Sequence, residues 1–159
     1  MSQQAQEFLS LLQHEADCAK QLLIALKAEN ATLHKLDAEK IEQSTRTKVQ
    51  HIKALEQAAS RCMVWLKRTS PNAITTTVSE YVNVLFPNNT PLIQILERVK
   101  QLALECQKLN EINGGIIALS QQYTQRALAI LHGDTPGMSL YGKEGKTTQK
   151  YSQKTLGKV

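Results

Sequence analysis

Four histidines and three cysteines are the residues of this chain best suited to proton transfer, phosphotransfer, nucleophilic attack or metal binding. Neither set has the spacing of metal ligands. The cysteines fall singly on predicted helices, as small buried residues in a reducing compartment do. We therefore expect no metal site and no cofactor. The residues are His14, His34, His51, His132, Cys18, Cys62 and Cys106.

Phosphotransfer on a histidine is the enzymatic alternative. It requires a histidine with a nearby lysine and a small residue on one exposed face of a helical bundle. His34-Lys35 is followed by Leu36 and Asp37, which fits that requirement poorly. The glycines between residues 142 and 145 are too sparse for a phosphate-binding loop and lack its strand and helix context. With no other catalytic constellation in view, we predict that the protein is not an enzyme and has no catalytic residues.

The composition is that of one helical domain. Of the 159 residues 42% are hydrophobic and only 4% aromatic, and the aliphatic residues recur at helical spacing. Glycine is absent before Gly114. No apolar run approaches the length of a membrane span, and the start lacks the features of a signal peptide, so we expect a cytoplasmic protein.

The net charge of +5 is concentrated at the carboxyl end, where the chain from Leu140 onward holds five lysines and a single acid, Glu144. This basic tail favours either a solvated terminus or an electrostatic contact with phosphate or an acidic surface. A helical protein whose tail binds nucleic acid or an acidic partner is therefore an alternative function. Against nucleic acid, no aromatic residues interleave with the basic ones and no recognition-helix pattern is present.

Apolar spacing predicts three main helices and a short one. The first runs from about Ser2 or Gln3 to about Lys27, and its pattern falters over residues 28–31, where Asn30 favours a cap or a break. The second ends before Ser70-Pro71. A short helix follows in the connector between the second and last helices. It is predicted from the spacing of Ile74, Val78, Tyr81 or Val82, and Leu85.

The last helix is predicted over about residues 91–132. Thr90 would cap it, Pro91 would occupy its first position, and His132-Gly133 would end it. Together these elements predict an all-α fold, an elongated antiparallel hairpin or coiled-coil bundle of three main helices with a short connector helix. We expect a helical domain over 1–139 and a flexible tail over 140–159.

Two apolar rows follow the last helix. The first row has the spacing of a coiled-coil seam, with polar interruptions at an asparagine and a serine. We expect one row to pack within the chain and the other to bind another protein. The first row is Leu92, Ile95 or Leu96, Val99, Leu102, Cys106, Leu109, Asn113, Ile116, Ser120, Tyr123, Ala127 and Ile130. The second row is Ala103, Leu104, Ile112, Ile117, Leu119, Leu128 and Leu131.

Polar and flexible residues interrupt the middle of this helix. Gly114 and Gly115 each cost roughly 1 kcal/mol relative to alanine, so a compensating gain is expected. One interpretation is a bent or thin segment that lets another backbone approach, with Asn110 and Asn113 fixing the register by hydrogen bonds. The other is a hinge or local break between two shorter helices.

The combination of these features resembles the FlgN family of flagellar export chaperones. The resemblance covers a leucine-asparagine pair, a second asparagine three residues later, an apolar helix and a tyrosine-glycine turn. The matching residues are Leu109, Asn110, Glu111, Ile112, Asn113, Gly114, Ser120, Ala127, Leu131 and the stretch 140–147.

The resemblance implies a chaperone of type III export that binds C-terminal helical segments of the hook-filament junction proteins FlgK and FlgL. It also implies delivery to the export-gate protein FlhA, with Tyr141 as the docking residue in a loop shaped by Gly142 and Gly145. The substrate-binding residues it implies are Leu109, Ile112, Asn113, Ile116, Leu119, Ser120, Tyr123, Ala127 and Ile130.

Overall fold

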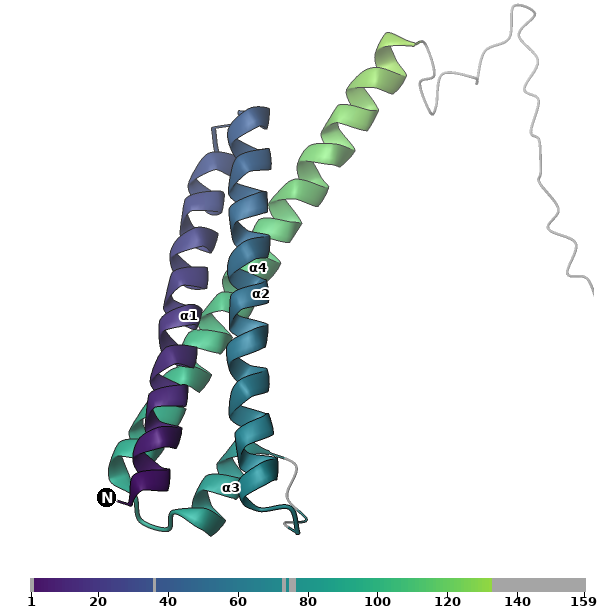
Figure 1. Ribbon diagram of the computed structural model, residues 1–159. Coiled ribbons are helices and arrows are strands. Elements are labelled where there is room, and N and C mark those ends of the chain that lie inside the picture. Colours follow the sequence, from purple (N-terminus) through teal and green to yellow (C-terminus); the bar gives the residue numbers. More distant parts are fainter. Residues whose placement is uncertain (1, 36, 73, 75–76, 133–159) are drawn as a thin grey trace, which may run out of the picture. The chain divides into compact units, whose positions relative to one another are not determined.

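The computed structural model describes residues 2–35, 37–72, 74 and 77–132. These residues form four helices, α1 (Gln3–Leu33), α2 (Ala38–Thr69), α3 (Val78–Leu85) and α4 (Thr90–Leu131) (Figure 1). No strand occurs among them, which confirms the all-α class. The described part of the chain divides after Ile117 into two units, residues 1–117 and residues from 118 onward. The hairpin or coiled-coil arrangement of the whole chain stays a prediction.

Side-chain caps set where three of the helices begin. The Ser2 hydroxyl accepts a hydrogen bond from the backbone N–H of Ala5, and the Asp37 carboxylate accepts one from that of Lys40. Thr77 begins α3 with a capping box, in which the Glu80 side chain accepts from the backbone N–H of Thr77 in return. These bonds satisfy N–H groups that the first helical turn leaves without intrahelical partners.

The prediction for the end of the first helix was wrong. α1 continues through residues 28–31 to Leu33, and the connection to α2 occupies residues 34–37. Asn30 neither caps nor breaks the helix, because its side-chain amide donates to Oδ1 of Asn113 on α4 at 2.8 Å. A contact with a distant helix thus overrides the local preference of asparagine for caps.

Two details around α3 also differ from the predictions. Ile74 lies outside the short helix and is fully exposed. α4 begins at Thr90, but Asn89 caps it, since Oδ1 of Asn89 accepts from the backbone N–H of Leu92 at 3.3 Å. The preceding turn is closed by a bond from the N–H of Asn89 to the carbonyl of Phe86, with Asn88 at a φ of 64°. Proline followed by a residue of positive φ is the pattern of a type II turn.

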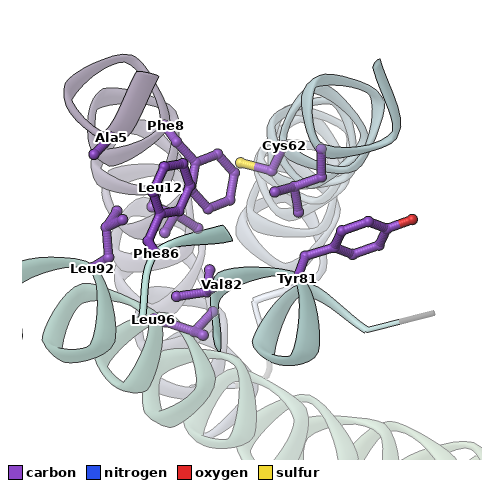
Figure 2. Close-up of a cluster of buried hydrophobic side chains, with 10 residues drawn as sticks. Ala5, Phe8, Leu12, Cys62, Tyr81, Val82, Phe86, Leu92 and Leu96 are labelled. Atoms are coloured by element: carbon purple, nitrogen blue, oxygen red, sulfur yellow. The ribbon is translucent and has the colours of Figure 1, made fainter. Parts of the chain in front are cut away.

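One part of the core gathers where α1, α2, α3 and the start of α4 meet (Figure 2). Phe8 is completely buried and stacks on Trp65 with ring centroids 5.0 Å apart. Phe86 stacks on both rings at 6.3 Å. Three of the chain's seven aromatic residues thus help to hold the short connector helix against the long ones.

A second part of the core joins the middle of α1 to α4. Leu22 and Leu26 of α1 pack with Val99, Leu102 and Cys106 of the first row, and residues of α2 border the cluster. Burying a leucine side chain stabilises the fold by about 1.5–3 kcal/mol. The first row is therefore the part of α4 that packs within the chain over this segment.

Candidate protein-binding site

The first row of α4 is buried as far as Asn113. Its buried members recur at helical spacing and face α1 and its neighbours in residues 1–117, and Leu109, between Cys106 and Asn113, is half-buried. Over residues 92–113 this confirms that one apolar row packs within the chain. The buried residues are Leu92, Leu96, Val99, Leu102, Cys106 and Asn113.

The second row is exposed over the same segment. Leu104 is 66% exposed and Ile112 is 47% exposed, although both are aliphatic. Leucine and isoleucine are normally among the most buried residue types, and an apolar row left open to water is a feature of binding sites. That the partner is another protein stays a prediction.

In residues 118–132, apolar members of both rows are exposed. Tyr123 and Ile130 of the first row are 60% and 64% exposed, and Leu119 and Leu128 of the second are 51% and 48% exposed. The helix therefore presents apolar side chains from more than one face in this unit. A partner that covers it must contact a broad stripe rather than a single seam.

The predicted substrate-binding residues fall into three groups. Ile112, Leu119, Tyr123, Ala127 and Ile130 are exposed. Leu109, Ile116 and Ser120 are half-buried. Asn113 is completely buried.

Asn113 was predicted to contact a client, but its side chain is used within the chain. Its Nδ2 donates to the backbone carbonyl of Leu26 at 3.0 Å and to Oε2 of Glu29 at 2.9 Å, while its Oδ1 accepts from Asn30. Every hydrogen-bonding position of the amide except one lone pair is therefore occupied. We assign Asn113 to the interior and remove it from the client-contacting set.

Glu29 is the centre of this polar cluster and is also completely buried. Its carboxylate pairs with Nζ of Lys48 at 2.9 Å and accepts a hydrogen bond from Oγ1 of Thr45 at 3.2 Å, in addition to the bond from Asn113. Lys48 is 14% exposed, so the pair is largely removed from water. We call Glu29, Asn30, Thr45, Lys48 and Asn113 the polar clamp.

The polar clamp was not predicted from the sequence. One signal was present, because Glu29 occupies the helical spacing that continues the apolar face of α1 from Leu22 and Leu26 to Leu33. A charged residue at such a position is almost never fully buried without a partner. Which residue is the partner has no local signal, since Lys48 and Asn113 belong to other helices.

Asn110, which was predicted to fix register together with Asn113, is instead exposed. It borders an open cavity of about 230 Å³ between α1, α2 and α4. Asn113 alone of the two holds α4 by hydrogen bonds to α1. The other lining residues are Leu22, Leu26, Ile52, Leu55, Ala103, Cys106 and Gln107.

Gly114 and Gly115 do not break the helix, because α4 is continuous through both. A Cβ atom added at either position would meet no other atom within 4 Å. Nothing inside the described chain therefore requires glycine there. A break between two shorter helices is therefore excluded, whereas a hinge and a thin place that another backbone could approach both stay predictions.

The surface after the clamp is uncharged. No acidic, basic or histidine residue occurs from Ile112 to Gln125, where amide and hydroxyl groups alternate with aliphatic ones. Charged residues are depleted at the centres of protein interfaces. The composition suits an interface formed by apolar packing and neutral hydrogen bonds.

The structure adds one pair of reactive groups, Cys18 and His14, whose Sγ and Nε2 lie 3.8 Å apart on the exposed side of α1. Burial raises the pKa of the Cys18 thiol, and the nearby Asp17 and Glu15 carboxylates raise it further. A nucleophilic cysteine needs the opposite shift. Among the described residues no group of acidic, histidine and cysteine side chains is arranged to hold a metal ion.

The predicted docking residues Tyr141, Gly142 and Gly145 and the predicted flexible tail lie outside the described residues. Within the described part of the chain no helix has the length and apolar character needed to cross a membrane.

Comparison with models of protein families gives a match. The family model for FlgN, described as FlgN protein, matches residues 1–149. No curated protein and no solved structure matches the chain. The matched range covers the four described helices and includes Tyr141 and Gly142, and it confirms the resemblance drawn from the sequence.

Proposed function

The chain belongs to the FlgN family, and from this premise we propose that it is a cytoplasmic flagellar export chaperone for the hook-filament junction proteins FlgK and FlgL. In this proposal it binds their C-terminal helical segments, prevents premature assembly and delivers them to the type III export gate. One observation supports the binding role above all. Apolar residues of α4 stay exposed on the second row and, in residues 118–132, on both rows.

A client helix would bind with its apolar face against this surface. The client-contacting residues in the proposal are Leu109, Ile112, Ile116, Leu119, Ser120, Tyr123, Ala127 and Ile130. Apolar surface that binding removes from water contributes about 25 cal/mol per Å² to the binding free energy. The entropy lost when the client becomes ordered offsets part of this gain. The outcome is a reversible complex, as delivery requires.

Tyr141 is the residue that would contact FlhA, with Gly142 and Gly145 shaping its loop. A tyrosine offers a large apolar ring with a hydroxyl at its tip, and tyrosine is enriched among the residues that dominate interface energies. Separate surfaces for client and gate would let the chaperone hold its cargo while it docks.

Acidic substitutions on the exposed surface of α4 test the client-binding role. The double variant Leu119→Asp, Tyr123→Asp places two charges on an uncharged apolar surface, and both replaced residues are exposed. We expect its affinity for the C-terminal segments of FlgK and FlgL, measured by titration calorimetry, to fall by more than about 100-fold, with helicity unchanged.

Val64→Asp is the matched control, because Val64 is also exposed, at 62%, but lies on α2. It should bind both segments like the native chain. Native affinity in the double variant, or an equal loss in the control, would contradict the proposed surface.

The alternative of a basic tail that binds nucleic acid rests on lysines between 143 and 158, all outside the described residues. No structural observation favours it.

A further inference from the structure

Two hydrogen bonds show how α4 pairs with α1. The thiol of Cys106 donates to the main-chain carbonyl of Ala19 at 3.4 Å, and Nδ2 of Asn113 donates to the main-chain carbonyl of Leu26 at 3.0 Å. The sequence separation between donor and acceptor is 87 residues in both bonds. The two helices therefore run parallel over this segment, and their contacts repeat with the spacing of one heptad.

The two helices also lie close together. A cysteine side chain is short, so its thiol reaches a main-chain carbonyl of another helix only where the two backbones approach each other. Ala19 is completely buried at this contact, and Ala16, one turn earlier on α1, is 8% exposed. Small residues on both helices thus set a short distance between their axes.

Short side chains continue along the same line of α4 beyond Asn113. The next two residues at heptad spacing are Ser120 and Ala127. A straight helix drifts by about 20° per heptad, so both positions lie within about 40° of Asn113 around the helix axis. We call Cys106, Asn113, Ser120 and Ala127 the heptad line.

Larger side chains flank the second half of the heptad line. Ser120 lies between Ile116 and Tyr123 at helical spacing. Ala127 lies in the same way between Tyr123 and Ile130, which are 60% and 64% exposed. Ser120 and Ala127 are therefore low points between larger apolar side chains, and a second helix can approach α4 closely there.

The second half of the heptad line has no helix of this chain packed on it as the first half has. Asn113 is the last buried residue of α4, although α4 continues for eighteen residues after it, whereas α1 ends seven residues after Leu26. No hydrogen bond of the Ser120 hydroxyl occurs among the described residues. A donor at the position that Cys106 and Asn113 use toward α1 is therefore available to a partner.

Resting on the proposed function, we infer that the client binds as an amphipathic helix that packs on the second half of the heptad line as α1 packs on the first. Its backbone lies against Ser120 and Ala127 at a similarly short distance. Its apolar residues recur at heptad spacing over about two heptads and contact the larger side chains beside the line. The Ser120 hydroxyl donates to a main-chain carbonyl of the client.

Leucine at the two short positions tests the close approach. Ser120→Leu and Ala127→Leu each add apolar area to the surface but hold the client helix away from α4. We expect each variant to weaken binding of the FlgK and FlgL segments by at least about tenfold in titration calorimetry, with helicity unchanged. If apolar area alone governed binding, both variants would bind as well as the native chain or better, and this result would overturn the inference.

Gln122→Leu and Gln125→Leu are the matched controls. Each adds the same side chain at an exposed position two residues from its counterpart, about 160° away around the helix axis. Both should bind the segments like the native chain. An equal loss of affinity in these controls would show that the effect of leucine does not depend on the heptad line, and the inference would be wrong.

Ser120→Ala separates the size of the side chain from its hydroxyl. It keeps the short side chain and removes one hydrogen bond, so the affinity should fall only a few-fold. A loss as large as that in Ser120→Leu would contradict the close approach. If Ser120→Leu fails to fold, because Ser120 is half-buried, Ala127→Leu at its exposed position decides the question.

The proposed function fails in a different way. If the native chain binds neither segment, the client role itself is wrong, and this inference falls with it. Native binding that leucine at residues 120 and 127 does not change would keep the client role and refute only the packing on the heptad line.

Discussion

Asn113 on α4 donates a hydrogen bond of 2.9 Å to the carboxylate of Glu29 on α1, across 84 residues of sequence. Both side chains are completely buried. The bond therefore joins the last long helix to the first at a point where neither partner can turn to water instead. The contribution of Lys48, the charge partner of Glu29, to the free energy of unfolding can be measured directly.

Replacing Lys48 should destabilise the chain more than neutralising Glu29. Lys48→Met leaves a carboxylate that is fully buried without its cation, and such losses cost about 3–5 kcal/mol. Glu29→Gln keeps a side chain of the same shape that still accepts hydrogen bonds, and Lys48 is near enough to the surface to reach water. We expect Glu29→Gln to lower the free energy of unfolding by about 1–3 kcal/mol.

Urea unfolding followed by circular dichroism measures both changes. Arg46→Met is the control, because Arg46 pairs with Glu42 on the exposed side of α2 and such pairs contribute little. If Lys48→Met cost no more than Arg46→Met, the carboxylate of Glu29 would not depend on its buried partner.

Alanine and glycine at residue 88, in the turn before α4, should affect the stability of the chain differently. Asn88 has a φ of 64°, where a Cβ atom is disfavoured except in residues such as asparagine that tolerate it. Asn88→Ala should therefore lower the free energy of unfolding by about 1 kcal/mol, while Asn88→Gly should be close to neutral.

Thermal melts of the two variants provide the comparison. Asn83→Ala, within α3, makes the same change at a helical position and should be neutral or stabilising. Equal melting temperatures for Asn88→Ala and Asn88→Gly would show that the backbone at residue 88 is not held in this conformation.

The sequence predicted those features of the fold that neighbouring residues determine, and missed those that depend on contacts with distant helices. The end of α2 was predicted because Pro71 acts on its immediate neighbour, and α3 was predicted from spacing within a few residues. The end of α1 was missed because Asn30 bonds to Asn113, and no pattern near Asn30 contains that information.

The same distinction holds for the candidate site. Periodicity predicted two apolar rows on α4, since each row is a local property of one helix. It did not say which row is buried, because that depends on the apolar side chains that other helices place against α4. The prediction for Asn113 failed for this reason: asparagine on an apolar face suits either a client or a buried partner, and only the three-dimensional position of Glu29 decides.

Acid should weaken the start of α2 through Asp37. The hydrogen bond from the Lys40 side chain is the largest cause that lowers the pKa of Asp37 below its ordinary 3.8, and the capping bond from the backbone N–H of Lys40 adds to it. A carboxylate with a lowered pKa stabilises the folded state above the unfolded pKa, and this contribution is lost as pH falls through the folded pKa. The loss should therefore appear below pH 3.8.

Melting temperatures of the native chain and of Asp37→Asn from neutral to acid pH reveal this effect. Asparagine also caps helices but does not titrate, so the advantage of the native chain should shrink only in the acid range. Glu39→Gln, in the first turn of the same helix, is the control for a carboxylate that is not the cap. An advantage of the native chain that did not change down to about pH 2 would argue against this role of Asp37.

Replacing Gly114 and Gly115 of α4 with alanine should raise the stability of the free chain and lower its affinity for a client. Both positions are helical and have open space where a Cβ atom would lie, so Gly114→Ala and Gly115→Ala should each stabilise the free chain by roughly 1 kcal/mol. Ala118→Gly, at an exposed position one turn later, should cost a similar amount.

If a client backbone approaches α4 at the glycines, the methyl groups should weaken binding of the FlgK or FlgL segment by several-fold although the chaperone itself is more stable. Thermal melts and binding titrations on the same samples measure the two effects independently. Stabilisation with unchanged binding would mean that the client crosses α4 elsewhere, whereas loss of stability would mean that residues 114 and 115 are not helical in solution.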